Sequence, residues 1–249
     1  MQPFSLLAVY KLYTQKQKIM NYSKLTITAA FIFFISACNF AQRTKVDVSS
    51  FEGISLHTSA TVYVTQGNGF NVEMEGDADD LENIKIEVEG NKLRIGNRKD
   101  NWNWSSNGSV KVYVTVSTLN YLSVSGSGNM IGKGTFKSDE LKASVSGSGD
   151  LEFDIDSDDV SVKISGSGGI ELRGKANEVD LSISGSGKLD AENLEANTYD
   201  ISISGSGKAR VHAKEEIESH ISGSGSVYYK GDPKRMNNNS SGSGKVRKI

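Results

Sequence analysis

The sequence predicts an all-β protein, a parallel β-helix-like solenoid with coils of about 19 residues, preceded by a partly antiparallel β section. Two observations carry this prediction. The tetrapeptide Ser-Gly-Ser-Gly occurs seven times, and apolar and polar residues alternate between the copies. The chain also holds 26 Gly but only 2 Pro in 249 residues. Because proline cannot donate to a β-ladder, this composition favours many turns within one hydrogen-bonded sheet.

The repeat has a nearly constant spacing of 21, 19, 19, 20, 18 and 19 residues, and its copies begin at Ser125, Ser146, Ser165, Ser184, Ser204, Ser222 and Ser241. A period of two in runs such as Val160, Val162 and Ile164 indicates strands with one buried face. A unit this short cannot bury that face alone, so successive copies are expected to stack as parallel coils about 4.8 Å apart.

The same alternation, followed through the motif from Val145, places Gly147 and Gly149 on the inner face and both serines on the outer face. Stacked coils then present two serine columns. We take as candidate ligand-binding residues Ser146, Ser148, Ser165, Ser167, Ser184 and Ser186.

The β domain is expected over residues 46–249, with a non-repetitive section at 46–122 and the solenoid at 123–249. Strands are expected in the first section at 46–48, 59–65, 71–74, 84–88, 92–95 and 110–116. Turn residues at 66–69 and 89–91 predict two hairpins, and residues 77–83 predict one helical turn. At the other end, Asn237 to Asn239 replace an apolar strand, which predicts a polar capping coil.

Residues 1–37 are typical of a lipoprotein signal peptide, with translation starting at Met20 in the simplest interpretation. The apolar run 25–35 is too short to span a bilayer. It ends in Ile35-Ser36-Ala37-Cys38, which resembles a lipobox and makes Cys38 the expected lipid attachment site, followed by a tether at 38–45. An ordinary signal with an incidental cysteine is the alternative. The expected location is therefore exported and membrane-anchored, at the outer membrane on its periplasmic or cell-surface face.

Charge and composition exclude some classes of partner and ligand. The first 37 residues hold four of the 28 Lys and Arg and none of the 30 Asp and Glu, so the mature chain carries a net charge of −6. That balance argues against nucleic acid as a partner. One Cys and three His leave little room for a metal site, and we expect no cofactor.

Two further groups of side chains invite a functional interpretation. Trp102 and Trp104 lie two residues apart in a polar stretch, where they either cap the solenoid or stack on a ligand. The densest acidic cluster consists of Asp154, Asp156, Asp158 and Asp159, which we place at a structural turn between two strands; a calcium site and a catalytic pair are the alternatives. No Gly-x-Ser-x-Gly nucleophile elbow occurs.

The runs Phe51-Glu52-Gly53-Ile54, Val62-Tyr63-Val64, residues 72–77 (Val-Glu-Met-Glu-Gly-Asp) and 92–95 (Lys-Leu-Arg-Ile) resemble the head GIN domain of putative auto-transporter adhesins. The resemblance covers about residues 46–245. It implies an all-β domain with β-helix-like stacking, a cell-surface role and no established catalytic residues.

The sequence thus favours a noncatalytic, lipid-anchored envelope protein that binds a glycan or a surface protein. The alternatives are a carbohydrate-active enzyme on a β-helix and a self-associating scaffold built on its serine columns. The oligomeric state stays open.

Overall fold

The computed structural model describes residues 43–98 and 110–249, which belong to one compact unit, Arg43–Ile249. Within these residues the chain forms strands almost throughout, with one short helix, α2 (Ala78–Asn83). The strands before the repeats are β1 (Thr44–Val46), β2 (Gly53–His57), β3 (Thr61–Gln66), β4 (Asn71–Glu75), β5 (Ile84–Glu89), β6 (Lys92–Asn97), β7 (Lys111–Val116) and β8 (Tyr121–Gly126). The repeats form β9 (Asn129–Gly147), β10 (Asp150–Gly166), β11 (Gly169–Gly185), β12 (Lys188–Gly205), β13 (Lys208–Gly223), β14 (Ser226–Lys230), β15 (Arg235–Gly242) and β16 (Lys245–Lys248).

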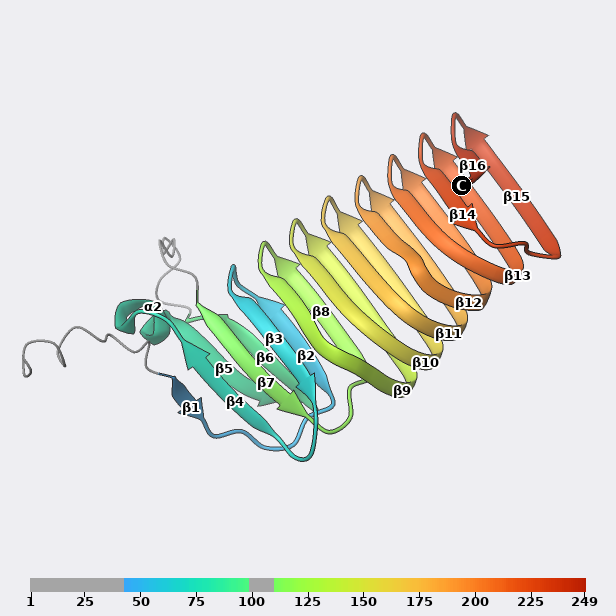
Figure 1. Cartoon of the computed structure of the whole chain (residues 1–249). Helices are drawn as coiled ribbons and strands as arrows, with labels where there is room; N and C mark the ends of the chain where they lie inside the picture. Colours follow the sequence, from blue (N-terminus) through green and yellow to red (C-terminus); the bar gives the residue numbers. More distant parts are fainter. Residues whose placement is uncertain (1–42, 99–109) are drawn as a thin grey trace, which may run out of the picture. The chain divides into compact units, whose positions relative to one another are not determined.

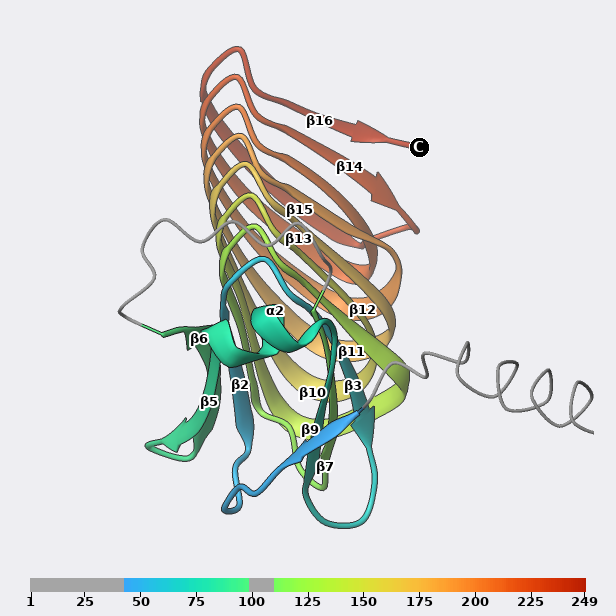
Figure 2. The ribbon, with the colours of Figure 1, turned by 90° about the vertical axis from the view of Figure 1, so that its left-hand side faces the viewer.

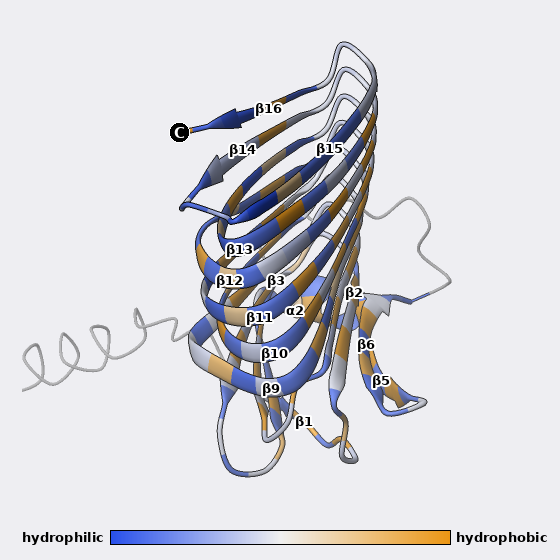
Figure 3. Cartoon of the chain, turned by 90° about the vertical axis from the view of Figure 1, so that its right-hand side faces the viewer, coloured by the Kyte–Doolittle hydropathy of each residue, from blue (hydrophilic) through white to orange (hydrophobic). Residues whose placement is uncertain are grey.

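The predicted solenoid is confirmed. Each of β9 to β13 is one long strand that bends back on itself to make a coil, and each pairs in parallel with the next (Figure 1). Residue pairs one repeat apart lie in register, as Ile164 does with Ile183. Figure 3 shows the expected alternation of hydrophilic and hydrophobic residues along the coils.

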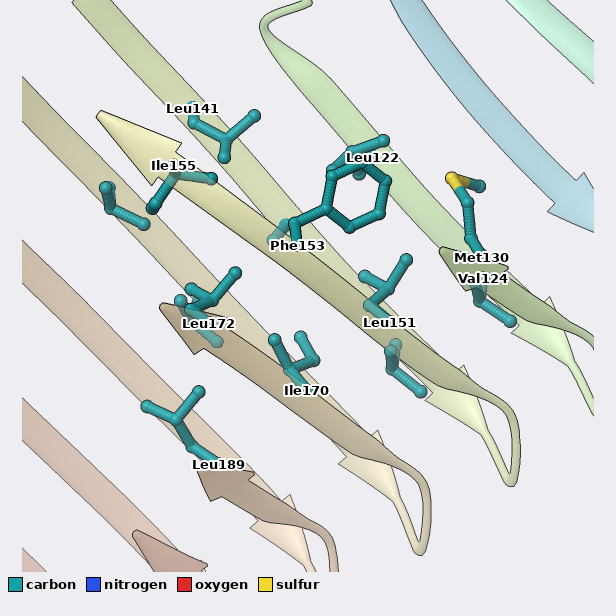
Figure 4. Close-up of a cluster of buried hydrophobic side chains, with 14 of the residues drawn as sticks. Leu122, Val124, Met130, Leu141, Leu151, Phe153, Ile155, Ile170, Leu172 and Leu189 are labelled. Carbon is teal, nitrogen blue, oxygen red and sulfur yellow. The ribbon is translucent and has the colours of Figure 1, made fainter. Parts of the chain in front are cut away.

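The core consists of apolar columns that run from coil to coil. One column stacks Val145, Ile164, Ile183, Ile203 and Ile221. The facing side of each coil contributes another column, in register, made by Leu151, Ile170, Leu189, Ala209 and Val227. All ten side chains are buried, and Figure 4 shows the packing between the two sides at the first coils. The apolar residues that looked like isolated alternations in the sequence therefore form one continuous core.

The Ser-Gly-Ser-Gly motif forms the sharp turn at which one coil passes into the next, and it corrects one expectation. Only its second glycine, such as Gly149 or Gly168, is buried as predicted. The first glycine has a positive φ, +135° at Gly147 and +124° at Gly166, so the strict alternation stops there. L-residues with a side chain rarely adopt this φ, which explains why glycine occupies the position.

The section before the repeats confirms the mixed pairing. Strands β1, β4 and β7 pair antiparallel, as do β5 and β6, whereas β2 and β3 pair in parallel with their neighbours. The hairpin at 89–91 is confirmed, with positive φ at Gly90 and Asn91. The hairpin at 66–69 is wrong, because β7 lies between β3 and β4 in the sheet. The helical turn at 77–83 is present as α2, and the sequence analysis missed β2.

The last coil is polar, as expected. Every residue of β15 is exposed, and Ser240 occupies the position that Ile221 holds in the coil before it. Among residues 43–98 and 110–249, no helix combines the length and the apolarity needed to cross a membrane.

The turn geometry predicts the effect of adding a single methyl group. A Cβ at Gly166 would lie 2.5 Å from the carbonyl oxygen of Gly147 in the preceding coil, and backbone at that position cannot move aside without breaking the ladder. We expect Gly166→Ala to lower the free energy of unfolding by about 3 kcal/mol or more, measured by urea denaturation.

Gly134→Ala is the matched control, because Gly134 also has a positive φ, +87°, but open space around it. It should cost only the backbone strain, about 1–2 kcal/mol. Equal losses for the two variants would show that the close approach between coils does not limit stability.

Candidate functional site

A shallow groove of about 560 Å³ lies on the outer face of the sheet where β4, β7, β3 and the start of β9 are neighbours. Alternation in β7 places Val112 and Val114 in the core and Lys111, Tyr113 and Thr115 on this outer face. The lining is polar apart from Val114 and consists of Arg43, Tyr63, Thr65, Asn71, Glu73, Lys111, Tyr113, Val114, Thr115 and Lys133.

Two tyrosines and two cations form a stack across the groove. Tyr63 on β3 and Tyr113 on β7 are in register, and their ring centroids lie 5.4 Å apart with 20° between the ring planes. The guanidinium carbon of Arg43 lies 4.0 Å from the centroid of Tyr113, and Lys133 Nζ lies 5.0 Å from that of Tyr63. Since Arg43 and Lys133 come from opposite sides of the pair in the strand order, each ring has one face against the other ring and one against a cation.

Glu75 holds one end of this stack in place. Its carboxylate accepts hydrogen bonds from Lys111 Nζ at 3.2 Å, the Tyr113 hydroxyl at 3.0 Å and Arg43 Nε at 3.2 Å. The bond from Lys111, followed by that from Tyr113, lowers the pKa of Glu75 below its ordinary value. The pKa of Tyr113 is raised, first by desolvation and then by its bond to Glu75. The stack is therefore held by charge-assisted bonds at its Arg43 end.

Lys133 marks the other end of the stack, and its environment differs. Within residues 43–98 and 110–249 it makes no ion pair, and its ammonium group lies over the Tyr63 ring. Thr65, in register with both Thr115 and Lys133, adds a hydroxyl beside it. The groove thus presents hydroxyls, an amide and one cation that is free to meet a ligand.

The serine columns are a second regular surface. Ser146, Ser165 and Ser184 lie in register on successive coils. The second serines of the motif hold the turns together through their backbone, since Ser167 N–H donates to the Gly147 carbonyl and Ser186 N–H to that of Gly166, both at 2.9 Å. All six candidate serines are exposed, as the sequence predicted: Ser146, Ser148, Ser165, Ser167, Ser184 and Ser186. Their role in binding stays a prediction.

A comparison with known protein families identifies the family of this chain. The sequence profile of the family described as "Putative auto-transporter adhesin, head GIN domain" matches residues 50–233. The chain belongs to the head GIN domain family.

Solved structures of similar proteins agree with this fold. A putative adhesin from Bacteroides fragilis is 26% identical, with a TM-score of 0.77, and the match covers 84% of this chain and 96% of that one. A putative lipid binding protein from Parabacteroides distasonis, 23% identical with a TM-score of 0.68, covers the same shares and shows the fold alone. No curated protein matches the chain.

In this head GIN domain the acidic cluster at 154–159 does not form the turn between two strands that the sequence analysis favoured. All four aspartates, Asp154, Asp156, Asp158 and Asp159, lie within the continuous strand β10, which bends there without ending. The bend is held instead by the buried Ser157, whose hydroxyl donates to the Asp159 carbonyl at 3.2 Å.

The carboxylates around this bend are partly paired. Arg173 on β11 makes ion pairs with Glu152, Asp154 and Glu171 at 2.8, 3.3 and 2.6 Å, and these bonds raise its pKa. Among the described residues, no group of three or more His, Cys, Asp or Glu side chains is arranged to hold a metal ion. The calcium and catalytic alternatives gain no support from this arrangement.

Three of the candidate residues from the sequence analysis lie outside the described residues: Cys38, Trp102 and Trp104. The sequence analysis in turn missed the groove residues Arg43, Tyr63, Tyr113 and Lys133. One signal was available for the tyrosines, since the tripeptide Val-Tyr-Val occurs at both 62–64 and 112–114. In a strand this pattern buries two valines and exposes the tyrosine between them.

The Glu75 network makes a testable prediction about acid. Removing the largest contributor with Lys111→Met should raise the pKa of Glu75 toward its ordinary value, measured by NMR titration of the side-chain carboxyl. Because the folded pKa is lowered, the stabilising contribution of Glu75 is present at neutral pH and is lost as the pH falls through that pKa.

Lys85→Met is the control, since Lys85 pairs with Glu87 rather than Glu75. It should leave the titration of Glu75 unchanged. An unaltered Glu75 titration in Lys111→Met would instead show that Lys111 does not hold the carboxylate.

Proposed function

We propose that this head GIN domain is a noncatalytic binding module of the cell envelope, exported and held at the outer membrane by lipid on Cys38. Its groove over β4, β7, β3 and β9 contacts a glycan or a surface protein. The observation that carries the proposal is the fixed stack of Arg43, Tyr113, Tyr63 and Lys133, which builds an ordered polar surface on a rigid sheet. Membership of the adhesin family supports the same function.

The stack also indicates how a ligand is bound. Both faces of each tyrosine ring are already covered, so a sugar ring does not stack on them. Recognition relies instead on Lys133 and on hydroxyls such as those of Thr65 and Thr115, which suit a polar ligand with a carboxylate or several hydroxyls. The mostly polar lining favours such a ligand over an acyl chain.

The groove supports binding better than chemistry. Its lining contains no histidine, cysteine or serine beside a carboxylate, so it offers no activated nucleophile. The carbohydrate-active alternative needs two carboxylates flanking a bound sugar, and around Arg173 the carboxylates are instead engaged in ion pairs. The scaffold alternative is favoured by one observation, the in-register serine column on adjacent coils.

Binding to glycan and protein arrays by residues 43–249 tests the groove. We expect Tyr63→Ser combined with Tyr113→Ser to weaken binding about tenfold or more, because it removes the stack that positions both cations. Tyr121→Ser is the matched control, since Tyr121 also carries a cation, Lys92 Nζ at 3.6 Å, but lies outside the groove.

Two further variants separate the other candidate surfaces. If Trp102→Ala combined with Trp104→Ala loses binding while the double tyrosine variant binds like the parent chain, the binding site lies in the tryptophan segment. Loss only in Ser165→Ala combined with Ser184→Ala would move it to the serine column, and turnover of any array sugar would favour the enzyme.

The anchor makes a separate prediction. In cells fed labelled palmitate, the full chain should take up label and Cys38→Ser should take up none, because the thiol is the acylated atom. Ser49→Ala, in the exposed segment after the tether, should label like the parent chain. Label retained in Cys38→Ser would contradict a lipid on this residue.

A further inference from the structure

The last coil of the solenoid in the described residues consists of β15 and β16. Within the described residues, β15 pairs only with β13 and β16 only with β14, so one edge of each strand is unpaired (Figure 1). The opposite end differs, because helix α2 lies across it and Leu81 packs against the core (Figure 2). Unpaired N–H and C=O groups along an exposed edge are a template for another strand.

Apolar surface accompanies this edge. Met236 stacks on Ile217 in register and is 38% exposed, and Ile249 beside β16 is 55% exposed. Among the described residues only one other large hydrophobic side chain, Phe70, is exposed. The last described coil therefore leaves exposed apolar side chains, on which a further strand could pack.

The same coil is strongly basic. Residues 230–249 contain six Lys and Arg and one Asp. Asp232 pairs with Lys248, and Arg235 pairs with Glu216. The remaining four cations make no ion pair within the described part of the chain: Lys230, Lys234, Lys245 and Arg247.

We propose that the edge of β15 and β16 adds an extended acidic segment of another polypeptide as a further strand. Backbone hydrogen bonds to the edge supply affinity, and alternate side chains supply specificity. Apolar residues at every second position cover Met236, and carboxylates between them meet the unpaired cations. This site is separate from the groove proposed above.

A second copy of this chain fits less well. Joining two such tips would bring together two surfaces that each carry four unpaired cations, and basic side chains on an edge oppose pairing between like strands. Residues 77–89 of a second copy hold six carboxylates and one lysine, which would suit the tip. However, Cys38 lies five residues from Arg43, so a lipid on Cys38 keeps the Arg43 end of the domain within about 18 Å of the membrane. The choice against a second copy rests on this anchor, because the tip of one copy would have to come down to the membrane to meet the Arg43 end of another.

The test uses residues 43–249 and a fluorescent peptide of alternating valine and glutamate long enough to run along both β15 and β16. Fluorescence anisotropy should show saturable binding that weakens as salt is raised. Lys234→Glu, Lys245→Glu and Arg247→Glu together should weaken it about tenfold or more. Lys163→Glu, the same change at an exposed lysine of β10 in the body of the solenoid, should leave it unchanged.

Three outcomes would overturn the proposal. No binding of the peptide would do so, and so would equal binding of a peptide whose backbone nitrogens are methylated at alternate positions, because charge alone then suffices. A molar mass that rises with protein concentration in the absence of peptide, and that the triple variant abolishes, would show the occupant to be a second copy. None of these results depends on the ligand of the groove or on the lipid.

Discussion

The close approach of glycine backbones at the turns is the constraint on which the rest of the structure depends. At the second glycine of the motif, a Cβ on Gly168 would lie 2.3 Å from the Gly149 carbonyl oxygen. At the first, positive φ turns the chain so that N–H groups such as that of Ser167 reach the carbonyl of the preceding coil. Glycine at both positions therefore lets the backbone ladder continue through the corner without interruption.

Once the corners are in register, every other column follows. A residue and its counterpart in the next repeat lie on adjacent strands, so an apolar position stacks on an apolar position and a serine on a serine. The repeat interval varies between 18 and 21 residues, yet the corners stay aligned because irregularities are absorbed elsewhere. In β12, for example, the shift lies between Ala191 and Glu195, where Leu194 is buried and accepts a hydrogen bond from the Tyr199 hydroxyl at 2.8 Å. The register at the turns is thus kept even though the length of the repeat varies.

This explains which parts of the fold the sequence predicted. A repeat makes local information sufficient, since each coil's partner is the next segment of the chain, and the solenoid, its core columns and its exposed serines could all be predicted. The hairpin at 66–69 could not, because β7, some 45 residues further on, takes the place beside β3 that the turn residues suggested for β4. Likewise Asp154 and its neighbours have turn composition, but pairing on both sides keeps β10 extended through its bend.

The groove could not be predicted from the sequence for the same reason. Its stack joins Arg43, Tyr63, Tyr113 and Lys133 from four separate segments, and only the order β1-β4-β7-β3-β9 places them together. The two Val-Tyr-Val tripeptides predicted exposed tyrosines, but nothing local indicated that they would be neighbours. Sites of this kind depend on non-local pairing, whereas the solenoid depends on local repetition.

The distribution of charge separates the body of the solenoid from its tip. Along the body, several cations pair with carboxylates of the coil before them, as Arg173 does with Glu152 and Asp154 and as Lys214 does with Glu195 at 3.2 Å. Such pairs neutralise charge between stacked strands, where like charges would oppose pairing. On the last described coil, Lys245 and Arg247 lie in register with Ser226 and Tyr228 of β14, so the neighbouring strand offers them no carboxylate at these positions. Unpaired cations, the exposed Met236 and an unpaired backbone edge therefore coincide on the last described coil, and together they make it the part of the solenoid best suited to accept another strand.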